Sequence, residues 1–235
     1  MSRTPIRSRQ GVAEESRPLS RAEQIDQLRS RMAALGGGPV PSEEEDAGTV
    51  IVGGPLRTLL PYGGLPRQAV THVSDTPALI VEILDRVAGT GGFAGVVGWP
   101  QLSYAGVGEG NLERVVAVPD PGLDAVTVAG VLAEGLDLVV MRTAQHVDLS
   151  PVRARPLLAR LRTGRAALVT VGASVPSPAA TVTGEIVDVH GVGRGVGRIA
   201  AIDIRVRVEA KGARPASRVI TLGTPLQRPG LRVVT

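Results

Sequence analysis

The turn at residues 73–80, VSDTPALI, lies where an α/β protein would place a phosphate-binding loop. A mostly β-branched run, Ala69 to Ser74, precedes it, and apolar residues at helical spacing follow it. Phosphate binding there needs glycines that let backbone N–H groups surround the anion, a lysine for the terminal phosphates and a hydroxyl for magnesium. The turn contains no glycine and no lysine. The sequence predicts the framework of a phosphate site without its chemistry.

The same turn has the residues of an ordinary helix start. Asp75 or Thr76 can act as the N-cap, and Pro77 is well suited to the first helical turn. The Asp75 carboxylate would lie where a phosphate oxygen would dock, and two like charges about 4 Å apart repel by roughly 4 kcal/mol at an effective dielectric of about 20. We expect the protein neither to bind nor to hydrolyse ATP.

Other catalytic chemistry has little support. The chain has no cysteine, which excludes thiolate catalysis and thiolate metal sites. Its three histidines, His72, His146 and His190, lack ligand spacing, so we expect structural or surface roles for them. Ser174 and Ser177 have no nucleophile-elbow context, and Trp99 fits a core residue better than a recognition residue. The sequence predicts no catalytic residue, no metal site and no cofactor.

Positive charge is concentrated in the last third. Residues 151–235 contain 13 arginines and one lysine against four acidic residues, a net charge of +10, whereas residues 47–150 have a net charge of −5. This asymmetry favours an anionic or acidic partner, although a solvated arginine surface is an equal alternative. The candidate binding residues are in the Gly-rich run HGVGRGVGRI and the strand after it: Arg194, Arg198, Arg205 and Arg207.

The predicted framework is an α/β fold with a doubly wound, mainly parallel sheet. Strands and helices alternate, and continuous apolar runs such as DLVVMR indicate strands buried on both faces. The expected strands are 68–73, 94–99, 113–118, 137–142 and 166–172, and the expected helices are 77–88, 102–109, 122–135 and 151–163.

The last third predicts an antiparallel extension with strands at 181–189, 198–210, 217–223 and 231–235. Strict alternation in DIRVRVE directs Ile204, Val206 and Val208 to one face and the intervening charged side chains to the other.

The N-terminal part predicts a tethered helix. Residues 1–18 have a disordered composition, residues 19–35 form a helix with a capping box at Ser20 and Glu23, and residues 36–48 form a flexible linker before a domain at 49–235. The helix has one narrow apolar stripe, which packs on its own domain or on a partner: Ile25, Leu28, Met32 and Leu35. The N-terminus has no signal-peptide core and the chain no membrane-length apolar run, so we expect a cytoplasmic protein.

The order of motifs resembles the RecA recombinase fold over residues 56–172. The segment Gly63-Gly64-Leu65-Pro66-Arg67 precedes the first strand, and Pro119-Asp120 leads through a helix to the Leu132…Gly135-x-Asp137-Leu138-Val139-Val140 motif. The four phosphate-loop signature positions of that fold fall on Val73, Ala78, Leu79 and Ile80. The metal-site acid falls near Arg142 and the water-orienting glutamate near Pro100. The resemblance implies a RecA-like domain without ATPase motifs.

Within RecA-like proteins, the chain resembles the actinobacterial ImuA-prime proteins, and the run G-x-G-R-G-x-G-R-I at Gly191 to Ile199 matches that family. The resemblance implies a non-catalytic accessory role in SOS-induced translesion synthesis. The implied partners are an ImuB-like polymerase paralogue, an error-prone C-family polymerase and RecA itself.

Two other functions remain open: a SulA-like RecA-fold inhibitor of cell division, and a DNA-binding repair protein that uses the basic last third. Scarce aromatic residues argue against stacking on single-stranded DNA, so direct DNA binding would be weak.

Overall fold

The computed structural model describes residues 48–122, 124–193 and 196–224. The tail at 1–18, the helix at 19–35 with its apolar stripe Ile25, Leu28, Met32 and Leu35, and almost all of the linker lie outside the described residues. The strand expected at 231–235 and Arg194 also lie outside them.

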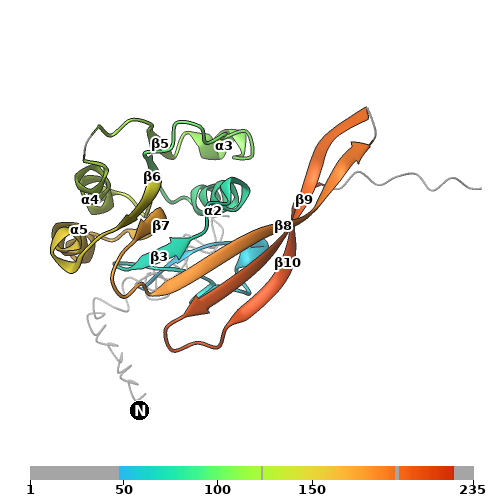
Figure 1. The fold of residues 1–235 in the computed structure, drawn as a ribbon. Coiled ribbons are helices and arrows are strands. Elements are labelled where there is room, and N and C mark those ends of the chain that lie inside the picture. The colour runs from blue at the N-terminus through green and yellow to red at the C-terminus, as the bar shows by residue number, and fades with distance from the viewer. Residues whose placement is uncertain (1–47, 123, 194–195, 225–235) are drawn as a thin grey trace, which may run out of the picture. The chain divides into compact units, whose positions relative to one another are not determined.

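The fold is built around an eight-stranded mixed sheet (Figure 1). The strand order across it is β10-β9-β8-β3-β7-β6-β4-β5; neighbours from β8 to β5 are parallel, whereas β9 is antiparallel to both β8 and β10. The predicted mainly parallel sheet with an antiparallel C-terminal extension is confirmed. The strands are β3 (Val70–Val73), β4 (Ala94–Val97), β5 (Val115–Val118), β6 (Leu138–Asp148), β7 (Ala167–Ser174), β8 (Ala180–Gly193), β9 (Val196–Ala210) and β10 (Ala216–Gly223).

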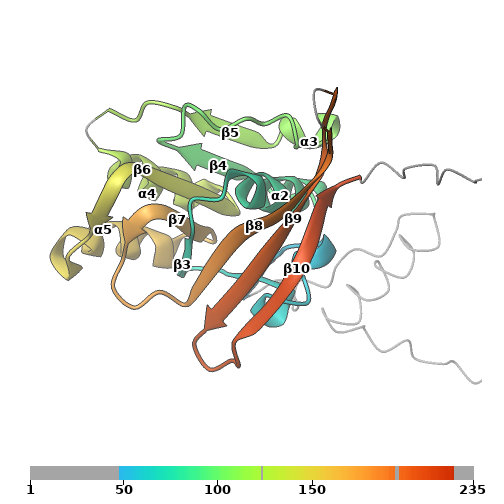
Figure 2. The same cartoon turned by 45° about the vertical axis from the view of Figure 1, so that its right-hand side comes forward.

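Helices cover both faces of the parallel strands (Figure 2). α2 (Pro77–Gly89) packs Leu79, Ile80 and Ile83 on one face, and α4 (Ala125–Gly135) and α5 (Pro151–Thr163) pack on the other. Successive strand residues therefore enter different cores, Val140 beside α2 and Val139 beside α4 and α5. This explains why β6 and β7 read as continuous apolar runs. No helix in the described ranges is long and apolar enough to cross a membrane.

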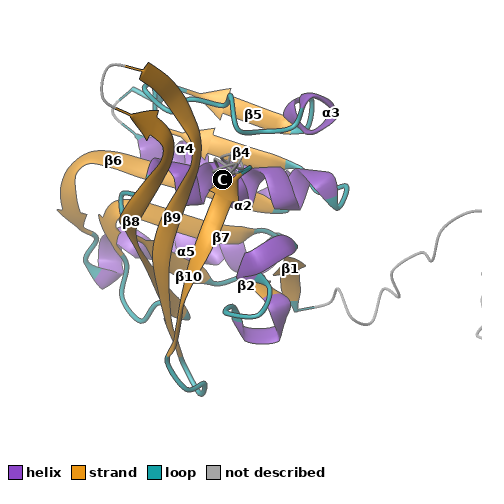
Figure 3. Ribbon diagram, turned by 90° about the vertical axis from the view of Figure 1, so that its right-hand side faces the viewer, coloured by secondary structure: helices purple, strands orange, loops and turns teal. Residues whose placement is uncertain are grey.

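The antiparallel extension has one buried face and one solvated face. Ile204, Val206 and Val208 are buried, whereas Arg205 and Arg207 are exposed, as the alternation predicts. β8 and β9 continue past the last pair of β9 with β10, Ala201 with Gly223, and end in a hairpin in which Val192 pairs with Gly197 and Gly193 with Val196; the projection comprises residues 187–193 and 196–200 (Figures 1 and 3). We call this two-stranded projection the arm.

Three parts of the fold differ from the sequence prediction. The helix expected at 102–109 is wrong: these residues form turns up to Gly108, and only the short α3 (Glu109–Leu112) follows. The glycines at 106 and 108 disfavour a helix, while Leu102 and Val107 anchor the loop in the core. β6 extends six residues beyond its expected end at 142, with a register shift against β7.

The third difference is a small unit that the sequence analysis missed. It comprises the antiparallel strands β1 (Thr49–Ile51) and β2 (Gly64–Pro66) and the 3₁₀ turns η1 (Gly54–Leu56) and η2 (Pro61–Gly63). Each element has three residues, too few to show a periodic pattern.

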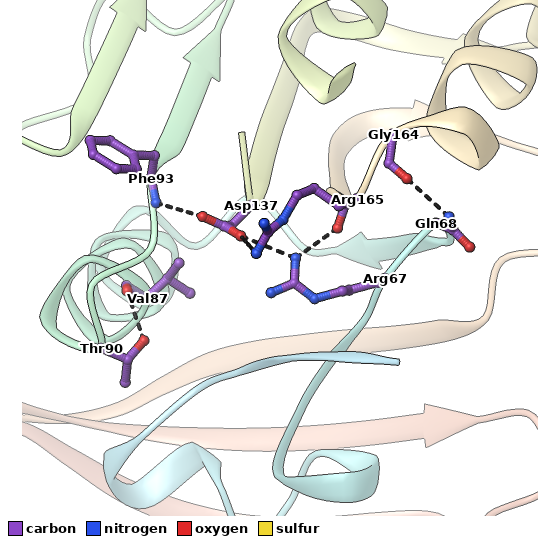
Figure 4. Close-up of polar contacts among 8 residues, drawn as sticks. All are labelled: Arg67, Gln68, Val87, Thr90, Phe93, Asp137, Gly164 and Arg165. Carbon is purple, nitrogen blue, oxygen red and sulfur yellow. Dashed lines mark hydrogen bonds and ion pairs between the residues drawn. The ribbon is translucent and has the colours of Figure 1, made fainter. Parts of the chain in front are cut away.

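Asp137 joins the chain segments that meet where β6 begins (Figure 4). Its carboxylate accepts hydrogen bonds from the Phe93 N–H at 3.0 Å and from Arg67 Nη1 at 3.1 Å, and it lies 3.1 Å from Arg165 Nη2. Arg67 Nη1 also donates to the Arg165 carbonyl oxygen. Arg67 and Asp137 belong to the motifs that resemble RecA, so these motif residues serve the framework.

Beside this cluster, Gln68 supports the end of α5. Its Nε2 donates to the carbonyl oxygens of Gly164 and Arg162, which the last turn of a helix leaves without intrahelical partners.

Burial acts to raise the pKa of Asp137, but the Phe93 N–H, Arg67 and Arg165 together hold that pKa below its usual value. A carboxylate with a lowered pKa stabilises the fold fully above its unfolded-state pKa, and the contribution disappears as pH falls through the folded-state pKa.

We expect Asp137→Asn to lower the free energy of unfolding at pH 7 by about 1.5–3 kcal/mol, because two arginines lose their charged acceptor. The deficit should be constant above pH 5 and should shrink as the pH falls below about 4. Denaturant unfolding across this range measures it, with the exposed carboxyl change Glu113→Gln as control. A deficit that is independent of pH would contradict this account.

Candidate functional site: the loop region at the start of α2

The turn between β3 and α2 is held against β8 by two hydroxyls. Ser74 Oγ accepts a hydrogen bond from the Gly184 N–H at 2.8 Å and lies 2.9 Å from Thr76 Oγ1. Thr76 Oγ1 donates to the Gly184 carbonyl oxygen at 3.0 Å. Thr76 is the N-cap residue and Pro77 follows it, as predicted, but neither Asp75 nor Thr76 caps α2 through its side chain. The threonine hydroxyl is used to attach the helix start to the neighbouring strand.

Asp75 forms an ion pair with Arg142. Asp75 Oδ2 and Arg142 Nη2 are 2.8 Å apart, and the side chains are 52% and 20% exposed. The Arg142 guanidinium also lies 5.0 Å from the centroid of the Trp99 ring, a cation–π distance. Trp99 is buried, as expected of a core residue.

These three residues lie near the carboxyl ends of the paired parts of three parallel strands, and Arg142 is still paired with Val171 of β7. Asp75 follows β3, Trp99 follows β4, and Arg142 lies one residue beyond the part of β6 that pairs with β4. In the sequence analysis the absent metal-site acid falls near Arg142 and the absent water-orienting glutamate near Pro100, next to Trp99, and Asp75 lies in the turn that contains the four phosphate-loop positions. The structure brings them together as an acid, an aromatic ring and a base in contact, while the buried Arg142 Nε has no hydrogen-bond partner among the described residues. We call them the Asp75–Arg142–Trp99 cluster.

The cluster leaves little for an anion to bind. Val73, Leu79 and Ile80, at three of the signature positions, are buried in the core, and Ala78 is partly exposed. The arginine near the turn is already bound to Asp75, so an anion would have to displace that carboxylate. The arrangement is suited to holding the turn before α2 and the loop after β4 against β6.

Of the arginines that the sequence analysis named as candidate binding residues, two form ion pairs on the strand face and one lies on the arm. Arg205 Nη1 lies 2.8 Å from Glu185 Oε2, and Arg207 Nη2 lies 2.7 Å from Glu209 Oε1. Arg198 lies on the arm and is exposed. The strand-face charges are therefore balanced within the chain. Exposed ion pairs of this kind contribute only about 0–1 kcal/mol and can be exchanged for another acidic partner.

Glycines shape the arm. Gly191 and Gly197 have positive φ angles of 92° and 97°. A Cβ on Gly197 would lie 2.1 Å from the Gly191 carbonyl oxygen, so the two strands could not approach as they do. The glycine pattern of the 190–199 run is a requirement of this hairpin.

His72 and His146 lie within hydrogen-bond distance of nearby polar groups. His72 Nε2 accepts the Val175 N–H at 2.9 Å, and burial, followed by the charge of His146, lowers the pKa of His72. His146 Nε2 lies 3.1 Å from Asp148 Oδ1 and 3.2 Å from Ser174 Oγ.

His190 is part of a group that sequence spacing did not reveal. β8–β9 pairing brings it to Asp188 and Asp203, and the potential ligand atoms of the three residues lie within 4.8 Å of one another. Hydrogen bonds from Thr221 and then His190 lower the pKa of Asp203. Of the described residues, these three have the geometry to hold a cation, but their internal contacts already give Asp203 two partners.

We expect the Asp75–Arg142 ion pair to contribute measurably to the free energy of unfolding. A double-mutant cycle with Asp75→Ala and Arg142→Ala should give a coupling energy of about 1 kcal/mol. Trp99 is the single tryptophan, so Arg142→Ala should also shift its fluorescence emission. The Arg205–Glu185 pair, equally short but more exposed, is the control and should couple more weakly and leave the emission unchanged. Equal coupling in the two cycles would contradict a special role for Arg142.

Comparison with known proteins supports one family. The model described as "MT3502 N-terminal domain" matches residues 58–177, a range that includes the whole Asp75–Arg142–Trp99 cluster. A curated relative, "Uncharacterized protein Rv3395c" of Mycobacterium tuberculosis (strain ATCC 25618 / H37Rv), is 36% identical over 167 residues, which cover 68% of this chain and 76% of the relative.

A solved structure, the KaiC-like protein PH0186 from Pyrococcus horikoshii OT3, is 10% identical with a TM-score of 0.45, covering 74% of this chain and 93% of that one. The chain belongs to the MT3502 N-terminal domain family.

Proposed function

We propose that this protein is a non-catalytic, RecA-like accessory protein of damage-induced translesion synthesis that binds an ImuB-like polymerase paralogue. The observation that supports the proposal is the Asp75–Arg142–Trp99 cluster, in which Arg142 and Trp99, at or next to the positions that the resemblance assigns to metal and water, contact Asp75 in the turn that the resemblance assigns to phosphate. The proposed role therefore depends on contacts with other proteins, with RecA and an error-prone C-family polymerase as further partners.

The energetics of the turn support a role without nucleotide hydrolysis. A phosphate loop makes several charge-assisted hydrogen bonds of about 1.5–3 kcal/mol each. Here Asp75 is the charged group of the turn and Arg142 is its partner, so binding a nucleotide would first cost that ion pair. No compensating lysine is present in the turn.

The arm is the proposed partner surface. It exposes Val189, Val192 and Ile199, and the last two lie beyond the last pair of β9 with β10, Ala201 with Gly223. A two-stranded ribbon is marginally stable alone, and clustered exposed apolar side chains mark interaction sites. Arg198 adds positive charge at the same place, which favours an apolar and acidic partner segment.

Direct DNA binding is the second candidate. It is favoured by the exposure of Arg198, Arg205 and Arg207, but the last two already have carboxylate partners. An inhibitor of cell division, as in SulA-like proteins, would use the same fold with a different partner, and co-purification identifies that partner directly.

We expect Val192→Asp combined with Arg198→Ala to weaken co-purification of the ImuB-like protein by tenfold or more, the effect of about 1.4 kcal/mol. The matched control is Val152→Asp with Arg153→Ala on α5, because Val152 is 81% exposed against 50% for Val192. The control should bind as the native chain does.

DNA binding by the same variants is measured across a salt series. If DNA is the ligand, the log–log salt slope should become shallower by about 0.7 for each arginine removed. A change in DNA affinity with intact partner binding would favour the second candidate, and no change in either would contradict the arm as a binding surface.

A further inference from the structure

A groove of about 460 Å³ separates the start of α2 from the strands that lead into the arm. Pro77, Ala78 and Val81 of α2 form one wall, Ile199 and Leu222 belong to the other, and the loop with Gln101 and Ser103 closes one side. We propose that the C-terminal segment of this chain, residues 225–235, docks in this groove.

The groove presents apolar surface that the described residues leave uncovered. Ile199 is 63% exposed, and Pro77 beside it is also exposed. The volume lies in the range of sites that accommodate a few side chains or a small ligand. Most of the named lining residues are apolar, and Glu82 supplies an acidic group among them, with its carboxylate bonded to Arg86.

The segment begins at the groove itself. Leu222 and Gly223 line it, and the Thr224 N–H donates to the Ala200 carbonyl oxygen at 3.2 Å, so residue 225 starts at the groove rim. Gly223 has a φ of 90°, and a Cβ there would lie 2.5 Å from that same carbonyl oxygen. A tether this short keeps the segment at an effective concentration in the millimolar range, so even weak contacts suffice for docking.

The composition of the segment fits the groove. PLQRPGLRVVT has two leucines and two valines but no acidic residue, and its two arginines are complementary to the charge of Glu82. Eleven residues extend over at most about 35–40 Å, ample to cross the groove and return. Because Ile199 belongs to both groove and arm, a docked segment would also cover part of the arm.

The test measures protection of a thiol in the full-length chain. The protein has no cysteine, so Ser103→Cys introduces a single thiol in the groove, and Val152→Cys introduces one on α5. We expect Leu231→Asp with Val233→Asp to accelerate maleimide labelling of the groove thiol about tenfold, equivalent to about 1.4 kcal/mol of docking. Labelling of the α5 thiol should not change.

The matched control adds the same charges at polar positions of the segment, Gln227→Asp with Thr235→Asp, and should accelerate labelling far less. Three results would overturn the proposal. The first is an unchanged labelling rate of the groove thiol in the Leu231/Val233 variant. The second is faster labelling only when Ile25 and Leu28 are replaced by glutamate. The third is protection of the groove thiol that increases with protein concentration. The second would assign the groove to the N-terminal segment and the third to a second copy of the chain.

Discussion

The Asp137 carboxylate is the contact on which the arrangement of the parallel strands depends. It fixes the segments before β3, β4, β6 and β7 at one edge of the sheet, through Arg67, Phe93 and Arg165. The loops at the carboxyl ends of these strands lie at the opposite edge of the sheet from this carboxylate. Ligands of parallel α/β sheets bind at that second edge. Here it is bridged by Asp75, Arg142 and Trp99.

The two edges explain how a chain can contain motifs that resemble those of RecA although its turn at 73–80 has no glycine and no lysine. Arg67 and Asp137 are motif residues with a structural role, so their presence implies a framework and no particular reaction. On the resemblance, the positions assigned to the reaction differ in charge from those of an ATPase: an acid, Asp75, lies in the turn and a base, Arg142, lies within β6. On our proposal, function has moved to the arm, where glycines permit close strand pairing and apolar side chains remain exposed.

Much of the fold could be predicted because its signals are local. The bounds 151–163 of α5 agree with the structure, since Ser150 and Pro151 mark its start and Gly164 its end. The alternation around Arg205 placed β9 correctly. Three-residue strands such as β1 give no periodic signal. The helix expected at 102–109 does not form, because glycines disfavour it and Leu102 and Val107 pack the loop into the core.

The candidate site depended on long-range contacts that spacing does not encode. The turn without phosphate chemistry could be read from its residues, but the bond between Asp75 and Arg142 joins positions 67 residues apart. The group at Asp188, His190 and Asp203 depends on a register shift in the β8–β9 pairing. The positive charge of the last third could be counted from the sequence, whereas the ion pairs of Arg205 and Arg207 with glutamates could not be predicted from it.

Titration calorimetry of the full-length protein with ATP and magnesium tests the central claim most directly, namely that the Asp75–Arg142–Trp99 cluster replaces a nucleotide site. The account predicts no binding heat up to about millimolar ATP, which corresponds to a binding free energy weaker than about −4 kcal/mol. Binding at micromolar concentrations, abolished by Arg142→Ala, would show that Arg142 serves a nucleotide and would contradict the account.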